Sequence, residues 1–213
     1  MILLPLILLS ASMTIYGEMD GRRGLVYIFK PLTTALILAL TWLRPADASD
    51  PYRLAIMIGL LFSLVGDVLL MLPSDRFVAG VAAFLAAHLA YLAAFSSRVP
   101  FGASPAAFGV VGLIVAAILA GLWRSLPARM RPPLVVYGAA LGAMTAQAAS
   151  QAILIPTAAT AAAAVGAVLF LFSDAALVTN RFARPFRLAP LAVLGTYYAA
   201  QTLIALSVTV ASP

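Results

Sequence analysis

Long apolar stretches dominate the chain, and short polar breaks separate them. Each stretch has close to the roughly 20 residues that an α-helix needs to cross the hydrocarbon core of a bilayer. The breaks contain proline, glycine, aspartate and arginine, as turns do. The pattern predicts about eight helices, over Ile2–Gly17, Phe29–Leu43, Arg53–Leu72, Phe77–Ser97, Ala106–Trp123, Pro133–Gln151, Thr157–Thr179 and Leu188–Val210. No linker or change of composition divides them, so we predict one domain over residues 1–213, an all-α integral membrane bundle.

Composition supports a bilayer as the surrounding medium. The chain is 64% hydrophobic and only 9% charged, whereas a soluble domain carries about a quarter charged residues. The formal charge of +6 comes almost entirely from arginines in the short gaps between apolar stretches. Basic residues in those gaps set membrane topology, so this placement argues against a nucleic-acid partner.

The positions of the basic residues predict an orientation. Ten of the 13 Lys and Arg residues fall in the gaps that follow the first, third, fifth and seventh predicted helices. By the positive-inside rule these gaps face the cytoplasm, which puts both termini outside. No Lys or Arg precedes Arg22, so the first helix lacks the basic start of a signal peptide and is expected to be retained. We predict a protein of the cell inner membrane.

The two halves of the chain share a pattern. The stretch "LFSLVGDVLLML" resembles "LFLFSDAALVTNRF", and their aspartates, Asp67 and Asp174, are 107 residues apart. The resemblance makes a parallel repeat of four plus four helices a candidate. Apolar sequences also align by chance, so the sequence leaves this repeat open.

Residue types exclude several kinds of chemistry. The chain has no cysteine and one histidine, His88. Disulfides, thiolate catalysis, Cys-ligated metals and multi-His metal sites are therefore excluded. We predict no metal and no cofactor.

Asp67 and Asp174 are the candidate catalytic residues. An ionisable group inside a membrane span is a functional candidate by default. Asp67 lies six residues before Pro73 and Asp174 six before Asn180, so each lies roughly 9 Å inside the same boundary. Two acids at matched depth are expected to share one cavity. The alternative is that each acid only hydrogen-bonds a neighbouring helix.

Other polar residues fall near the same layer and are candidates for substrate binding. Lys30 is expected to open the second helix, or alternatively to extend to the interface. The alternative for Glu18 is an ordinary solvated position on the surface. The alternative for His88 is a packing role near the midplane of the bilayer. The candidates are Lys30, Glu18, His88, Tyr91, Ser173, Asn180, Arg181, Tyr197, Tyr198 and Gln201.

A pair of adjacent acids has a specific use. Two carboxyl groups close together in an apolar setting hold one proton between them. The result is one acid and one base, the arrangement of aspartic proteases and glycosidases. Such a pair breaks an acetal-like bond or an amide with water, and it needs neither a thiol nor a metal.

Ordered motifs over nearly the whole chain resemble the YhhN / lysoplasmalogenase family. They are "FKPLTTALILAL", "GLLFSLVGDVLLML", "FVAGVAAFLAAHLAYLAAF", "GAVLFLFSDAALVTNRF" and "YYAAQTLIALS". The resemblance implies a polytopic membrane hydrolase that cleaves the vinyl ether bond of lysoplasmalogens, which are lysophospholipids. The products would be a fatty aldehyde and glycerophosphoethanolamine or glycerophosphocholine.

On this resemblance each candidate acquires a role. One aspartate gives a proton, and the other stabilises the resulting cation and activates water. Lys30 binds the phosphate or, alternatively, sets the pKa values of the aspartates, and Arg181 with the neighbouring basic residues attracts the headgroup at the cytoplasmic face. Tyr197, Tyr198 and Gln201 orient water or the glycerol hydroxyl.

Two other functions fit membrane aspartates. A proton- or ion-coupled transporter of small molecules or lipids would use Asp67 and Asp174 as its ion sites. An intramembrane aspartyl protease is disfavoured, because Asp67 follows "LVG" without the first glycine of Gly-x-Gly-Asp, and no Pro-Ala-Leu motif occurs. The motifs do not determine the oligomeric state.

Overall fold

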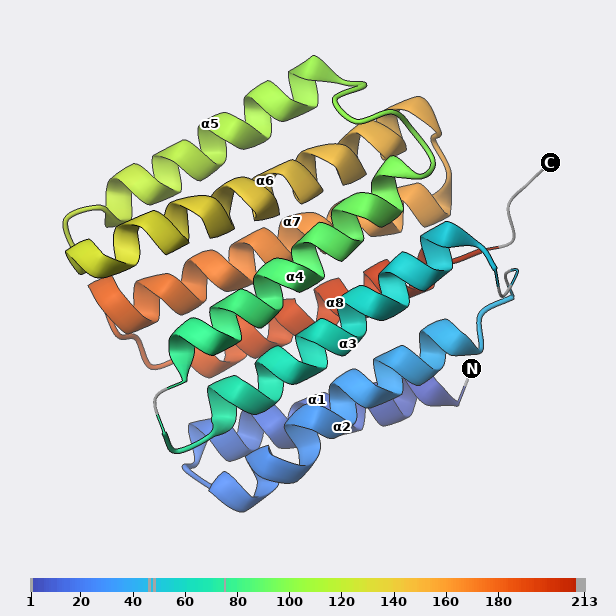
Figure 1. Cartoon of the computed structure of the whole chain (residues 1–213). Coiled ribbons are helices and arrows are strands. Elements are labelled where there is room, and N and C mark those ends of the chain that lie inside the picture. Colours follow the sequence, from blue (N-terminus) through green and yellow to red (C-terminus); the bar gives the residue numbers. More distant parts are fainter. Residues whose placement is uncertain (1, 46, 48, 75, 210–213) are drawn as a thin grey trace.

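The computed structural model describes residues 2–45, 47, 49–74 and 76–209. Within them, eight α-helices lie side by side as a bundle, and no strand is present (Figure 1). The helices are α1 (Leu3–Met19), α2 (Arg23–Trp42), α3 (Pro51–Met71), α4 (Phe77–Ser96), α5 (Pro105–Leu122), α6 (Arg131–Leu154), α7 (Ala158–Val178) and α8 (Thr196–Leu206). Shorter helical turns are η1 (Ala128–Met130), η2 (Thr179–Ala183) and η3 (Leu191–Gly195). The predicted all-α bundle is confirmed.

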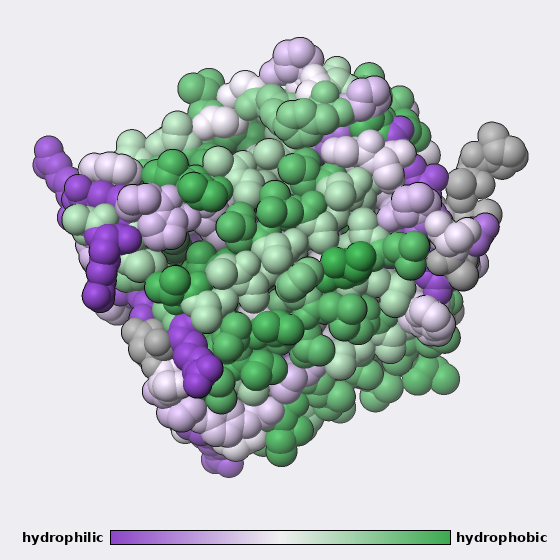
Figure 2. Space-filling view, in the orientation of Figure 1, coloured by the Kyte–Doolittle hydropathy of each residue, from purple (hydrophilic) through white to green (hydrophobic). Residues whose placement is uncertain are grey.

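The outer surface suits a bilayer. Helices α2, α3, α4 and α5, and α7 continued through η2, are long and apolar enough to cross a membrane. The segments Leu3–Met19 and Leu191–Leu206 are apolar but shorter. Figure 2 shows a broad apolar band between two polar ends, and side chains such as Leu113, 73% exposed, form this band. The chain is an integral membrane protein.

Two predicted helices differ from the observed ones. The second begins at Arg23, not at Phe29, because Pro31 lies inside the helix rather than at its start, which membrane helices tolerate. The eighth predicted stretch, residues 188–210, is divided between η3 and α8, and residue 210 lies outside the described residues. The other predicted bounds are within three residues of the observed ones.

The packing of the helices follows the candidate repeat. Adding four to each helix number turns the packed pairs α1–α2, α2–α3 and α3–α4 into α5–α6, α6–α7 and α7–α8, which also pack. With α4 corresponding to α8 and α2 to α6, the packed pair α4–α6 likewise corresponds to the packed pair α8–α2. Gly59 and Gly166, also 107 residues apart, both allow close approach: Gly59 faces the Tyr91 ring of α4, and Gly166 faces the Ala200 carbonyl of α8. These contacts support two related halves.

The close approach at Gly59 gives a stability prediction. In Gly59→Ala the new Cβ would overlap the ring of Tyr91, so we expect a loss of about 1–3 kcal/mol of unfolding free energy. The matched control is Gly109→Ala in α5, where a Cβ meets nothing within 4 Å. There the better helix propensity of alanine should be neutral or favourable. Thermal unfolding in detergent compares the two variants, and equal melting temperatures would contradict the close packing.

The two ends of the bundle differ. Figure 1 shows the α1–α2, α3–α4, α5–α6 and α7–α8 connections at one end, and both chain termini at the other. The first end is named here the arginine-rich end, because it carries Arg22, Arg23, Arg76, Arg124, Arg129, Arg131, Arg181, Arg184 and Arg187. That this end faces the cytoplasm stays a prediction.

Candidate active site

Asp67 lies on α3 in a fully enclosed polar group. Only 1% of its surface is exposed. Its Oδ2 accepts hydrogen bonds from the Thr34 hydroxyl of α2, at 2.6 Å, and from the Tyr197 hydroxyl of α8, at 2.9 Å. Lys30, one turn before Thr34, interacts electrostatically with Asp67. The buried Lys30 belongs to the interior of α2 and does not open the helix as predicted.

Asp174 lies on α7 in a second polar group. Its Oδ2 accepts a hydrogen bond from the Tyr137 hydroxyl of α6 at 2.5 Å. His88 Nε2, on α4, is 3.3 Å from the same oxygen and 2.9 Å from the Tyr137 oxygen. His88 Nδ1 is buried without a partner among the described residues. His88 is therefore a member of the Asp174 group rather than an isolated packing residue.

The two groups are built alike. Each acid is bound by a hydroxyl from the preceding helix, Thr34 of α2 or Tyr137 of α6. Each also meets a polar side chain from the last helix of the other half, Tyr197 of α8 or His88 of α4. The candidate repeat thus extends to the surroundings of the two carboxyl groups.

The two carboxyl groups, which the sequence predicts as an adjacent pair, have separate hydrogen-bond partners among the described residues. No hydrogen bond joins them, and aromatic rings connect their partners. The Phe170 ring lies 4.7 Å from the His88 ring and 5.5 Å from the Tyr197 ring, between centroids. Equal depth determines only the position of each acid along its helix. The orientation of the helix about its own axis determines which neighbouring helices the acid faces, and here each acid faces a different set.

A pocket at the arginine-rich end lies above both acids. This mouth pocket has about 640 Å³ of unoccupied space, part of it open to the surface. Its walls include Leu70 and Leu177, each three residues beyond one of the acids, so both acids lie about 4.5 Å deeper than this wall. The complete lining is Glu18, Lys30, Leu70, Phe77, Leu177, Asn180, Arg181, Ala189, Pro190, Val193 and Leu194. Four predicted binding residues, Glu18 of α1, Lys30 of α2, and Asn180 and Arg181 of η2, therefore line one pocket.

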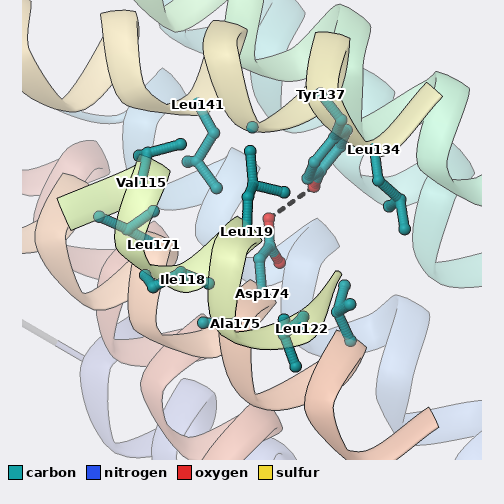
Figure 3. A pocket seen from close by; sticks show the side chains of 12 residues that line it. Val115, Ile118, Leu119, Leu122, Leu134, Tyr137, Leu141, Leu171, Asp174 and Ala175 are labelled. Carbon is teal, nitrogen blue, oxygen red and sulfur yellow. Dashed lines mark hydrogen bonds between the residues drawn. The ribbon is translucent and has the colours of Figure 1, made fainter. Parts of the chain in front are cut away.

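A second space adjoins Asp174 alone. This apolar cavity lies between α5, α6 and α7, and its approximately 430 Å³ of empty space includes space that is open to the outside. Figure 3 shows the Asp174 carboxyl group and the Tyr137 hydroxyl facing each other among aliphatic side chains. The lining is Val115, Ile118, Leu119, Leu122, Leu134, Tyr137, Gly138, Leu141, Leu171, Asp174, Ala175 and Val178. Asp67 lines neither this cavity nor the mouth pocket, so the expected cavity shared by both acids is not among these two spaces.

The remaining predicted residues support these groups. The Tyr91 hydroxyl donates to Gln201 Oε1 at 2.6 Å, and both side chains are fully buried. Tyr198 is buried, and its hydroxyl has no hydrogen-bond partner among the described residues. Ser173 donates to the Val193 carbonyl at 2.9 Å, which fastens η3 to α7.

Two residues of η2, which follows α7, line the mouth pocket. Asn180 Oδ1 accepts a hydrogen bond from the Phe186 backbone amide at 3.1 Å, which holds the α7–α8 connection in place. The Arg181 guanidinium lies over the Phe77 ring, 4.2 Å from its centroid. Asn180 is therefore partly used by the fold, while Arg181 presents a positive charge beside Lys30.

Tyr137 is the site residue that the sequence did not reveal. It lies six residues after Arg131, at the depth that the six-residue spacing gave for the acids. The depth argument, applied to the sixth helix, would have found it. Among the described residues, no three His, Cys, Asp or Glu side chains cluster as metal ligands would.

Comparison with known proteins identifies relatives over most of the chain. The model of the YhhN family matches residues 25–208. Lysoplasmalogenase TMEM86B of Sus scrofa is 38% identical over 172 residues, which is 79% of this chain and 69% of the relative. TMEM86B of Homo sapiens is 35% identical over 191 residues, 88% of this chain and 77% of the relative. The uncharacterized membrane protein YhhN of Escherichia coli O157:H7 is 31% identical, covering 92% and 93% of the two chains. No solved structure matches.

Proposed function

The chain belongs to the YhhN family, and from this we propose that it is a membrane hydrolase that cleaves the vinyl ether bond of lysoplasmalogens. Relatives named lysoplasmalogenase support this activity. The observation that carries the mechanism is the placement of two buried carboxyl groups, Asp67 and Asp174, one turn beneath a pocket that contains Lys30 and Arg181.

The reaction calls for an acid and a base. A vinyl ether, R–O–CH=CH–R′, is protonated on the carbon farther from oxygen, which leaves an oxocarbenium ion on the carbon next to oxygen. Water adds to that carbon and loses a proton, and the hemiacetal collapses to the alcohol R–OH and the aldehyde OHC–CH₂–R′. Glycosidases pass through the same kind of cation with a pair of carboxyl groups.

The surroundings of the acids support a division of roles between them. Asp67 lies close to the Lys30 cation and receives two hydroxyl hydrogen bonds. Asp174 faces the apolar cavity. Tyr137 and His88 both meet Oδ2 of Asp174, so Oδ1 is the oxygen that transfers the proton. We therefore assign Asp174 as the proton donor, and Asp67 as the anion that stabilises the cation and accepts a proton from water.

The mouth pocket suits the headgroup of a lysophospholipid. Lys30 and Arg181 offer positive charge to the phosphate, and Glu18 offers negative charge to the ethanolamine or choline nitrogen. A headgroup held there places the ether bond, which lies next to the glycerol, at the depth of the two acids. We place this end of the bundle at the cytoplasmic face, following the excess of arginine.

The test uses three lysophospholipids that differ only at the bond to the chain. Purified protein is incubated with the 1-alkenyl, 1-acyl and 1-alkyl forms of one lysophosphatidylethanolamine, and products are identified by mass spectrometry. We expect a fatty aldehyde from the alkenyl form and no cleavage of the alkyl form, because only the vinyl ether is opened by protonation of carbon. Absence of aldehyde, or release of fatty acid from the acyl form instead, would refute the proposed reaction.

The related halves favour a second candidate function. Two similar sets of helices with one acid in each half are also the architecture of some ion-coupled transporters. Proteoliposomes distinguish the two functions. Uptake of a solute driven by a proton gradient, without aldehyde release, would favour the transporter.

A further inference from the structure

We propose that the apolar cavity between α5, α6 and α7 binds the first part of the alkenyl chain of the substrate, and that the chain enters from the bilayer between α5 and α7. The identity of this ligand rests on the proposed function. The cavity itself, its position and its lining are independent of that function.

The lining of the cavity suits hydrocarbon. Ten of its twelve residues are aliphatic or glycine, and the two polar ones, Asp174 and Tyr137, are hydrogen-bonded to each other. Transfer of apolar surface into such a space is favourable, whereas a polar headgroup would lose its hydration without new partners. Of the substrate's two ends, only the chain fits here.

The cavity extends along the membrane normal past Asp174. Its wall begins near the arginine-rich end at Leu122, Leu134 and Val178 and reaches inward to Val115, Leu141 and Leu171. Seven residues separate the two levels on each helix, a depth of about 10 Å. Asp174 lies between the two levels. A lipid with its headgroup at that end would therefore pass its first chain carbons directly beside this acid.

Helix α5 leaves a lateral opening. It packs along α6 but scarcely contacts α7, although both helices line the cavity. Figure 1 shows α5 at the margin of the bundle, and its apolar side chains Leu113 and Val110 are exposed on the surface of the protein. The cavity is partly open to the outside. A chain already in the bilayer thus reaches Asp174 without leaving the hydrocarbon layer.

Ala175 controls the width of this cavity. It follows Asp174 on α7, lines the cavity and is half-buried. Ala176 is equally half-buried on the same helix but is not part of the lining. A phenylalanine at Ala175 fills the space in which we place the chain, and a phenylalanine at Ala176 does not.

The experiment uses a probe that the protein does not cleave. A 1-O-alkyl lysophosphatidylethanolamine with a diazirine near the start of its chain is photolysed with wild-type protein, Ala175→Phe and Ala176→Phe in nanodiscs. We expect labels on lining residues of α5, α6 and α7 in the wild type and in Ala176→Phe. In Ala175→Phe this labelling should fall about tenfold or more, equivalent to about 1.4 kcal/mol of binding.

Thermal unfolding shows whether Ala175→Phe is folded, and Ala175→Val replaces it if it is not. Undiminished labelling of the cavity in a folded Ala175 variant, or wild-type labels that lie elsewhere, would overturn the inference. Measuring aldehyde release distinguishes a failure of the chain site from a failure of the proposed function. If the wild type is labelled in the cavity and releases no aldehyde, the proposed reaction fails and the chain site stands. If Ala175→Phe cleaves the alkenyl substrate with an unchanged KM, the chain site fails and the reaction stands.

Discussion

Replacing Asp174 with asparagine is expected to lower aldehyde release from a lysoplasmalogen by about 10²–10⁴-fold, the range that a general acid contributes. The amide has almost the same shape as the acid, and its oxygen can still accept the hydrogen bond that Tyr137 donates in the wild type. It cannot deliver a proton to carbon. Folding should therefore be preserved while the first chemical step is lost.

Two controls make this result specific. Asp20→Asn makes the same chemical change at an exposed carboxylate that pairs with Arg22, and it should leave the rate unchanged. Tyr137→Phe keeps the acid and removes the hydroxyl that meets both Asp174 and His88. Two hydrogen bonds between uncharged groups are together worth about 1–3 kcal/mol, so its loss of rate should be about 10–100-fold. A wild-type rate in folded Asp174→Asn would exclude Asp174 as the proton donor.

Asp67→Asn is expected to lower the same rate by about 10²–10³-fold, as removal of a group that stabilises a transition-state charge does. It should also lower stability, because the buried Lys30 then keeps its charge without its nearby counter-charge. A low rate alone would not separate these effects. Melting temperature in detergent is therefore measured together with aldehyde release.

The double variant Lys30→Met, Asp67→Asn separates the effect on the reaction rate from the effect on stability. It removes both charges, so stability should recover toward the wild-type value while aldehyde release stays low. Recovery of the rate together with stability would mean that Asp67 serves only to balance Lys30. In that case, the carboxylate has no part in the chemistry.

The two halves show how one framework supports two roles. Asp67 and Asp174 take equivalent places, and each receives a hydroxyl from the preceding helix. The difference lies in the surroundings, where a lysine is close to Asp67 and an apolar cavity adjoins Asp174. Two carboxyl groups of one site in unlike surroundings commonly divide into acid and base.

The sequence alone determined the helices, the polar ends and the depth of the acids. Hydrophobicity is a local property of the chain, so long apolar stretches with arginine between them predicted the bundle within a few residues. Two helices were exceptions. The second starts earlier than predicted, because Pro31 marks an end in water but lies inside α2 here, and the eighth is divided between η3 and α8. The burial of Asp67 and Asp174 followed from their positions within such stretches.

Only the tertiary structure decided what each acid touches. The hydrogen bond from Tyr197 to Asp67 joins residues 130 positions apart, and Tyr137 and His88 reach Asp174 from two other helices. Position along a helix sets depth, but packing between helices sets the rotation of each helix and therefore its neighbours. For this reason the matched depth of the acids was visible in the sequence, while their separate hydrogen-bonded groups, and the cavity beside Asp174, were not.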